Sequence, residues 1–267
     1  MKRFLNFIKS IRVKVFIFFS KTINISIGGK LDFKIILTTV NEYYRAKTFY
    51  TKEPETLQWI ENLNQYTSKE NFILWDIGAN IGIYSLFTAK KHPSSIIYSF
   101  EPEATSFSSL CKNISMNNFS NIKPFLIGIS NRTGYDFLKV SELSSGAGAA
   151  SVGKEYSHLD SKKIFSQGIN IIKLDSLIKD HKFSCPNFIK IDVDGHEKEI
   201  LDGAKNLLSN KDLRAIMIEL EYNNQKDLKT YLDLFKGYQF KLARKSTWKE
   251  FSNGSIIQNF LFEKTIK

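Results

Sequence analysis

Cysteine is scarce in this sequence. Its 267 residues contain only Cys111 and Cys185. Two distant cysteines are too few for a disulfide scaffold and do not have the spacing of a metal site. The chain is therefore expected to fold without disulfides, with both thiols buried, and to reside in a reducing compartment such as the cytoplasm.

The sequence also lacks a long apolar segment near its start. The longest uncharged apolar run within residues 1–33 is VFIFF, at residues 15–19. A helix that spans a membrane needs about 20 such residues. No small-residue cleavage site follows a clean apolar core, which argues against a secretory signal.

Acidic residues are rare in the same region. Residues 1–50 hold ten Lys or Arg but only Asp32 and Glu42, a net charge of +8 out of +11 for the whole chain. Such a segment either contacts an anionic membrane surface through residues 1–27 or packs on the domain as a helix and a strand. No recognised nucleic-acid motif accompanies it, and no nucleic-acid partner is expected. Residues 1–52 are predicted to be an extension and residues 53–267 the domain.

From residue 53 onward, the apolar patterns of strands and helices alternate. Strands are expected at residues 72–77, 95–102, 122–129, 187–195, 213–223, 238–244 and 255–264, and helices at 53–63, from about 81, and at 105–118, 196–210 and 227–235. Strands joined by crossover helices run parallel, whereas the last two, joined by a short loop, must be antiparallel to each other. This layout predicts an α/β fold: a doubly wound, Rossmann-like sheet of seven strands in the order 3-2-1-4-5-7-6, as in methyltransferases.

One stretch interrupts this alternation. Residues 131–140 and 169–177 look extended, and residues 141–160 between them are rich in Ser, Gly and Ala. We expect a mobile loop there, which is either a cover over a substrate or a plain insertion. The loop at 141–168 and the N-terminal segment are expected to form most of the acceptor pocket wall.

The turn after the first strand of the domain has a distinctive composition. It reads Asp76-Ile-Gly78-Ala-Asn80-Ile-Gly82, a G-x-x-x-G spacing. The G-x-G-x-x-G fingerprint of dinucleotide sites and the Walker phosphate loop are both missing from the chain. Nothing basic lies in the turn to meet a pyrophosphate, and an acid stands beside it. A ligand with ammonium and sulfonium groups suits this turn better than one with two phosphates.

The second strand ends in Phe100-Glu101-Pro102. An acid at this place in a doubly wound sheet accepts hydrogen bonds from a ribose diol. Glu101 could instead be an acid favoured by the N-terminus of the following helix. We predict the diol contact, because the position at the strand end is specific.

Three segments, residues 75–89, 98–118 and 189–208, together resemble the FkbM-type S-adenosylmethionine-dependent methyltransferases. The resemblance covers roughly residues 53–263 and implies methylation of hydroxyl groups on sugars of surface glycans or on polyketide-type products. It implies S-adenosylmethionine as cofactor and a small-molecule or glycan acceptor. The implied donor-site residues are Asp76, Gly78, Ala79, Asn80, Gly82 and Tyr84 around the methionine part, Glu101 and Pro102 at the ribose, and Gly128 and Ser130 near adenine, where Ser130 replaces the more usual acid.

The fourth strand ends in Asp192-Val-Asp194-Gly-His196-Glu197, facing the first turn in this topology. Methyl transfer requires an aligned hydroxyl and a group that takes its proton. Asp192, His196 and Glu197 are the predicted catalytic residues, with His196 as the base because its pKa lies near neutrality. Asp192 and Asp194 could instead hold a divalent cation, although no metal site is indicated.

Two further charged features adjoin this site. Lys190 lies inside an apolar strand and needs a partner, for which Asp192 and Asp76 are candidates. Glu219 and Glu221 end the fifth strand on one face, where they either touch substrate or are solvated.

Two other enzyme classes remain as alternatives. An NAD-dependent reductase or epimerase is disfavoured by the missing phosphate-loop glycine and the antiparallel last pair of strands. A nucleic-acid methyltransferase that modifies a base amine would carry N/D-P-P-Y after the fourth strand, where this chain reads DVDG. Nothing in the sequence indicates an oligomeric state.

Overall fold

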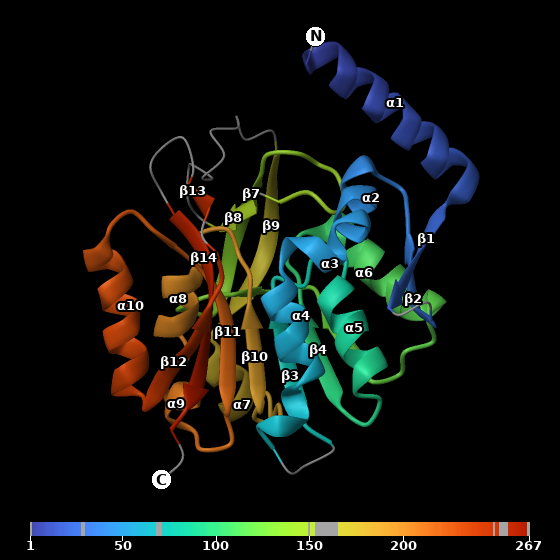
Figure 1. Ribbon diagram of the computed structural model, residues 1–267. Helices are drawn as coiled ribbons and strands as arrows, with labels where there is room; N and C mark the ends of the chain where they lie inside the picture. Colours follow the sequence, from blue (N-terminus) through green and yellow to red (C-terminus); the bar gives the residue numbers. More distant parts are fainter. Residues whose placement is uncertain are drawn as a thin grey trace.

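The fold is a central β-sheet with helices on both faces (Figure 1). The computed structural model describes residues 2–27, 30–67, 71–148, 150–152, 165–247, 249–250 and 256–265. The main sheet contains β3 (Ile73–Ile77), β4 (Ile96–Phe100), β5 (Ile122–Phe125), β10 (Phe188–Ile191), β11 (Ala215–Tyr222), β12 (Phe240–Lys245), β13 (Lys249–Glu250) and β14 (Ile256–Lys264). The predicted α/β class with a mostly parallel sheet is confirmed.

The strands lie in the order β12-β14-β11-β10-β3-β4-β5, with the two-residue β13 beside β14. The five strands from β11 to β5 are parallel, and β14 runs antiparallel to both β11 and β12. The strands of this sheet other than β13 can be numbered 1 to 7 along the chain. Read from β5 to β12, their order is then 3-2-1-4-5-7-6. The carboxyl ends of β3 and β10 are therefore neighbours in the middle of the sheet, where the winding reverses.

Alternating side chains of the strands fill two separate cores. Leu74 and Phe188 face the side covered by α4 (Pro54–Glu61), α5 (Ile83–Lys91) and α6 (Ala104–Met116). Trp75 and Ile189 face the side covered by α7 (Leu174–Lys179), α8 (Glu197–Asp202), α9 (Lys205–Ser209) and α10 (Gln225–Gly237). Apolar residues on both faces account for the continuous apolar runs of these strands.

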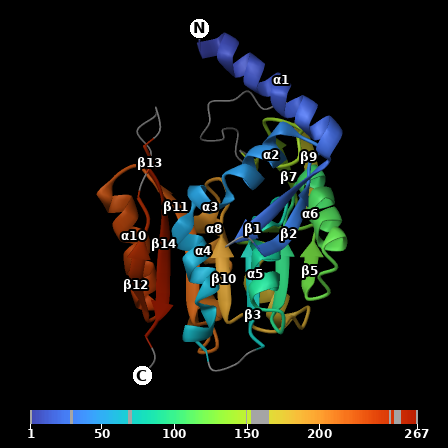
Figure 2. The ribbon, with the colours of Figure 1, turned by 45° about the vertical axis from the view of Figure 1, so that its right-hand side comes forward.

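The N-terminal segment adds to the first of these cores. It forms α1 (Lys2–Ser20), the antiparallel hairpin β1 (Thr22–Ile27) and β2 (Lys30–Ile36), α2 (Val40–Lys47) and α3 (Phe49–Lys52). Phe33 and Phe49 are buried in the same cluster as Phe87 and Leu110. The hairpin and α2 thus share a core with the sheet, whereas α1 contacts α2 through Phe16 and extends outward from there (Figures 1 and 2). The division of the chain at residue 53 stays a prediction.

The third predicted strand, at residues 122–129, is in fact two. It breaks after β5, and β6 (Gly128–Ile129) pairs with β9 (Phe165–Ile172) in a second sheet with β7 (Gly134–Val140) and β8 (Ala150–Val152). A tight turn, in which Ile127 N donates to Phe125 O at 3.1 Å, separates the two pieces. Residues 125–129 read FLIGI, without a polar side chain, so the sequence does not mark this break.

The single helix predicted at residues 196–210 is also divided, into α8 and α9. A Cβ at Gly203 would lie 2.2 Å from the carbonyl oxygen of Ser130. The glycine permits close packing against the turn after β6, and the chain kinks there before α9 begins.

Only the first part of the long loop can be compared with the prediction of a mobile cover. Ser145 Oγ donates to Glu42 Oε1 at 2.7 Å, and Arg45 Nε donates to Gly146 O at 2.5 Å, so this part is held against α2. Residues 153–164, where much of the predicted cover falls, lie outside the described residues.

Candidate functional site

A cavity of about 350 Å³ lies at the carboxyl ends of β3, β4, β10 and β11. Arg45 and Lys52 of the N-terminal segment line it, and so do Glu142, Ala147 and Val152 of the long loop and β8. These two regions thus contribute to the wall, but most of its residues come from the strand ends and the turns after them. That they form most of an acceptor pocket stays a prediction. No role was assigned to Lys52 from the sequence, because its neighbours contain no motif that would distinguish it from other lysines.

Gly78 brings two strand ends together at the floor of this cavity. Its φ is +80°, and a Cβ there would lie 2.0 Å from the carbonyl oxygen of Asp192. Gly78 N and Ala79 N both donate to Phe100 O, at 2.9 and 3.0 Å. The turn therefore crosses from β3 toward both neighbouring strands, a path that a side chain at residue 78 would block.

Five of the residues predicted to bind the donor do not line the cavity: Asp76, Ala79, Gly82, Tyr84 and Ser130. Gly82, with φ +86°, packs against α6, where a Cβ would lie 2.3 Å from Leu110 Cδ1. This glycine serves helix packing, and the G-x-x-x-G spacing alone did not distinguish that use from ligand contact. The roles of these five residues in donor binding stay predictions.

Asp76 lies beneath the turn. Its side chain is buried, and Ser85 Oγ donates to its Oδ2 at 2.5 Å. Its Oδ1 has no hydrogen-bond partner in the part of the chain that the structure describes. Burial raises the pKa of this carboxyl, against the opposing effects of Lys190 and of the Ser85 hydrogen bond.

Glu101 occupies the position predicted for a ribose contact, on the cavity wall. Its Oε2 accepts from Asn80 N at 2.7 Å, and its Oε1 accepts from Glu103 N at 2.8 Å. Burial raises the pKa of Glu101 to about 7, although both hydrogen bonds act in the opposite direction. Each carboxylate oxygen has a further lone pair, so Glu101 can accept two more hydrogen bonds from a ligand.

One end of the cavity is apolar. Its wall there consists of Ile127, Gly128 and Ile129 around β6, Leu138 and Val140 of β7, Val152 of β8, and Ile200 of α8. Such a surface fits a planar aromatic base. The predicted adenine contact Gly128 lies in this wall, as Pro102 and Asn80 do elsewhere in the cavity.

His196, the predicted base, also lies on the cavity wall. Its Nε2 is 3.0 Å from Oγ of Ser130, the other residue predicted near adenine, which is buried and does not line the cavity. The structure thus places His196 at the turn after β6, next to the apolar end.

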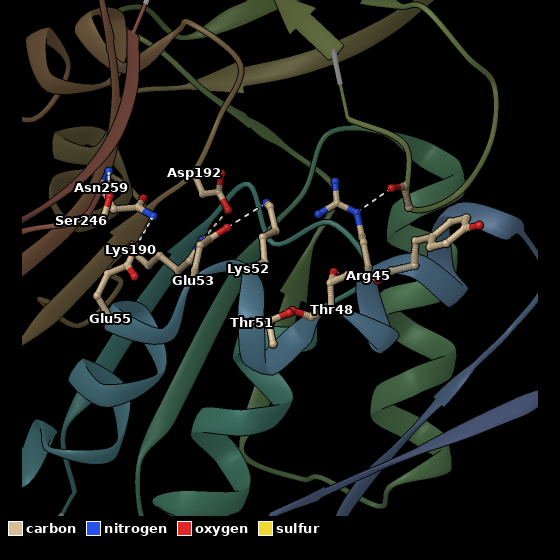
Figure 3. Close-up of polar contacts among 12 residues, drawn as sticks. Arg45, Thr48, Thr51, Lys52, Glu53, Glu55, Lys190, Asp192, Ser246 and Asn259 are labelled. Atoms are coloured by element: carbon tan, nitrogen blue, oxygen red, sulfur yellow. Dashed lines mark hydrogen bonds and ion pairs between the residues drawn. The ribbon is translucent and has the colours of Figure 1, made fainter. Parts of the chain in front are cut away.

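The other end of the cavity is charged (Figure 3). Lys190 Nζ lies 2.7 Å from Asp192 Oδ2, so that of the two candidate partners, Asp192 and Asp76, Asp192 forms the ion pair. Lys52 Nζ lies 2.8 Å from Glu53 Oε1 and extends from the end of α3 toward the same region. Burial acts to raise the pKa of Asp192, but the ammonium groups of Lys190 and Lys52 outweigh it and hold the pKa below its usual range.

Glu219 of β11 completes the charged end. Burial, with the negative charges of Asp192 and Glu53, raises its pKa to about 8, and Lys52 and Lys190 only partly oppose this. Glu219 can therefore take up a proton near neutral pH, which Asp192 cannot. The sequence identified Glu219 only as a strand-end acid that either touches substrate or is solvated.

Glu197 stands apart from the other predicted catalytic residues. It is buried but does not line the cavity, and its Oε1 accepts from Gly195 N at 3.0 Å. Only Asp192 and His196 of the predicted trio reach the cavity. Among the described residues, no three His, Cys, Asp or Glu side chains are grouped so that they could hold a metal ion.

The chemistry of this cavity fits S-adenosylmethionine. The donor has an apolar adenine ring, a ribose diol, and positive charges on its sulfur and amino groups. The cavity offers an apolar wall at β6 and β7, the hydrogen-bond acceptors of Glu101, and the ionised Asp192 carboxylate. The adenine, the ribose and the positive charges of the donor thus each have a complementary surface.

Curated relatives are similar over part of the chain. The hexuronic acid methyltransferase AglP of Haloferax volcanii is 29% identical over 153 residues, which cover 57% of each chain. Methyltransferase 1 of Beauveria bassiana is 25% identical over 150 residues, 50% of this chain and 58% of that protein. The chain thus spans just over half the length of the curated relatives it matches. Among solved structures, the METTL16 methyltransferase domain superposes with a TM-score of 0.49 at 15% identity, covering 88% of this chain and 84% of that one.

The sequence model of the family described as "Methyltransferase FkbM domain" matches residues 76–242. This match extends from the first turn through β11 to β12 and covers more than half of the chain. It favours a methyl donor over the NAD alternative. The protein therefore belongs to the FkbM methyltransferase family.

Proposed function

We propose that this enzyme methylates a hydroxyl group of an acidic sugar, free or within a glycan. One observation carries the proposal: the guanidinium of Arg45 and the ammonium of Lys52 line the same cavity as Asp192 and Glu219. Cations suit an acceptor that carries a carboxylate, and a nearby carboxylate suits the hydroxyl that reacts. The similarity to a hexuronic acid methyltransferase supports the same substrate class.

Four groups of this chain would hold the donor. Glu101 accepts from the ribose hydroxyls, and the apolar wall at β6 and β7 contacts the adenine. Asp192, kept ionised by Lys190, attracts the positive charges. Gly78 lines the cavity and lets its turn pack directly against the backbone of Asp192, so that the turn and this carboxylate lie side by side. When bound, S-adenosylmethionine supplies a methyl carbon attached to a positively charged sulfur. The sulfur keeps the electron pair of the broken carbon–sulfur bond and leaves as a neutral thioether.

Glu219 is the proposed base. The acceptor oxygen forms the new bond to the methyl carbon, and its proton passes to the Glu219 carboxylate. A base works best when its pKa is near the operating pH, and burial beside Asp192 raises the pKa of Glu219 to about 8. His196, predicted as the base, is instead engaged with Ser130 at the apolar end.

Arg45 is the cation proposed to meet the acceptor's carboxylate. Its Nε and Nη2 donate to the carbonyl oxygens of Gly146 and Ala147, which orient the side chain. Its Nη1 has no hydrogen bond to another described residue and is available for a ligand. Lys52, already paired with Glu53, adds positive charge at the same end.

The test compares acceptors under identical conditions. The purified chain is incubated with methyl-labelled S-adenosylmethionine and a hexuronic acid glycoside, the matching neutral hexose glycoside, or transfer RNA. Labelling of the hexuronic acid well above that of the hexose is the expected result. Equal labelling of the two sugars would contradict recognition of the carboxylate. Labelling of the RNA alone would favour the nucleic-acid alternative and overturn the proposal.

A further inference from the structure

Helix α1 has one face that packs on the body of the protein. Val13 is only 8% exposed, Ile17 packs against the core cluster, and the ring of Phe16 lies 5.5 Å from that of Tyr43 in α2. These contacts fix α1 at the surface next to α2. One side of the helix thus contacts the rest of the protein, and the opposite side faces away from it.

The opposite face is apolar and exposed. Its members are spaced by one or two helical turns: Ile11, 45% exposed, Val15, 51%, Phe18, 75%, and Phe19, 79%. The spacing i, i+4, i+7, i+8 places them in one stripe along the helix. A contiguous patch of large apolar side chains on a surface usually marks a binding site.

Cations border this stripe on both sides. An α-helix turns about 100° per residue, which places Arg12 just beyond one edge and Lys14 just beyond the other. Both side chains are exposed, as are Lys9 and Lys21. No acidic residue occurs before Asp32 in the sequence. The partner must therefore offer an apolar layer next to negative charge.

An anionic lipid bilayer has both properties at its surface. We propose that α1 binds in the plane of such a bilayer, with Phe18 and Phe19 at the acyl boundary and Arg12 and Lys14 at the lipid phosphates. Among the described residues, no helix is long and apolar enough to cross a membrane, so α1 would lie on it. A second copy of the chain is disfavoured as the occupant, because it would bring two equally basic helices together.

The position of α1 relates this surface to the active site. A groove between α1 and the long loop is lined by Lys14, Ile17 and Phe18 on one side and by Glu142 and Ser144 on the other. Glu142 also lines the donor cavity. In Figure 2, α1 and α2 lie at the end of the sheet toward which the parallel strands point. Binding through α1 would bring that end of the molecule to the membrane.

Sedimentation with lipid vesicles tests this proposal on the full chain. Vesicles of phosphatidylcholine alone are compared with vesicles that also contain phosphatidylserine, at low and high salt. The expected result is binding to the anionic vesicles that weakens with salt. The double substitution Phe18→Asp/Phe19→Asp should weaken it at least about tenfold, since each ring contributes apolar burial. Arg12→Glu/Lys14→Glu should also weaken it.

Leu242→Asp is the matched control, because Leu242 is 42% exposed on β12, outside α1. It should bind vesicles like the unchanged chain. Affinity for S-adenosylhomocysteine should be unaltered in every variant, which shows that the fold is intact. The proposal is overturned if the unchanged chain does not bind anionic vesicles, or if the Phe18/Phe19 variant binds them equally well. It is also overturned if the two phenylalanines prove necessary for dimers in solution and not for vesicle binding.

Discussion

The ammonium of Lys190 lies 2.7 Å from a carboxylate oxygen of Asp192 and 4.5 Å from the centroid of the Tyr84 ring. Residues two apart on a strand point to the same face, so this pair arises from the local geometry at the end of β10. The pair keeps the half-buried Asp192 ionised. Glu219, without so close a cation, is left as the carboxyl that titrates near neutral pH.

Lys190→Met should strongly destabilise the protein. It leaves the buried Asp76 and the half-buried Asp192 without the Lys190 cation. The removal of one partner from a fully buried pair typically costs about 3–5 kcal/mol, which is an upper bound here because Asp192 is 25% exposed and keeps Lys52 nearby. The free energy of unfolding, measured with urea, should fall by up to that amount. The double variant Lys190→Met/Asp192→Asn should recover part of the loss, because it removes the unpaired charge. A double variant less stable than Lys190→Met would contradict this account.

Gly78→Ala should be more damaging than Gly82→Ala. Both glycines have positive φ, which costs a residue with a side chain about 1–2 kcal/mol. At residue 78 the added methyl also meets the backbone carbonyl of Asp192, whereas at residue 82 it meets a movable side-chain end of Leu110. Thermal unfolding gives the comparison, and Leu110→Ala should partly rescue Gly82→Ala. Equal stability losses in the two single variants would show that contact with Asp192 does not matter.

Glu101→Ala should weaken binding of S-adenosylhomocysteine at least about tenfold, since hydrogen bonds to a charged group contribute about 1.5–3 kcal/mol. Calorimetric titration measures this affinity. Asp76→Asn is the comparison, because Asp76 is buried beneath the turn and does not line the cavity. That variant should bind with nearly unchanged affinity. Unaltered affinity in Glu101→Ala would show that Glu101 does not contact the donor. A large loss of affinity in Asp76→Asn would support the contact between Asp76 and the donor that the family resemblance implies.

Glu219→Gln should abolish the pH dependence of catalysis. In the unchanged enzyme, kcat/KM should fall below a pH of about 8, because the protonated carboxyl cannot accept the hydroxyl proton. The fall should approach tenfold per pH unit. The Gln variant should be slow at every pH and should keep its affinity for S-adenosylhomocysteine. His196→Asn is the matched variant, and if it alone lost the pH dependence, His196 would be the base.

The sequence determined the features that depend on near neighbours. The alternation of apolar strands and amphipathic helices specified the α/β class, because periods of 2 and 3.6 residues are local properties of the backbone. The acid at Glu101 and the glycine at residue 78 were identifiable for the same reason. So was the pairing of Lys190 with Asp192, which are two positions apart on one strand.

Only the tertiary structure decided which distant groups share the cavity. Arg45 and Lys52 reach Asp192 and Glu219 because α2 and α3 pack over the ends of strands that lie more than a hundred residues later in the chain. The break between β5 and β6 has a similar cause, since β9 supplies the partner of β6. The ability of Glu219 to hold a proton follows from its burial among other charges. That burial arises from the packing of segments that are distant in the sequence, so no sequence pattern can predict it.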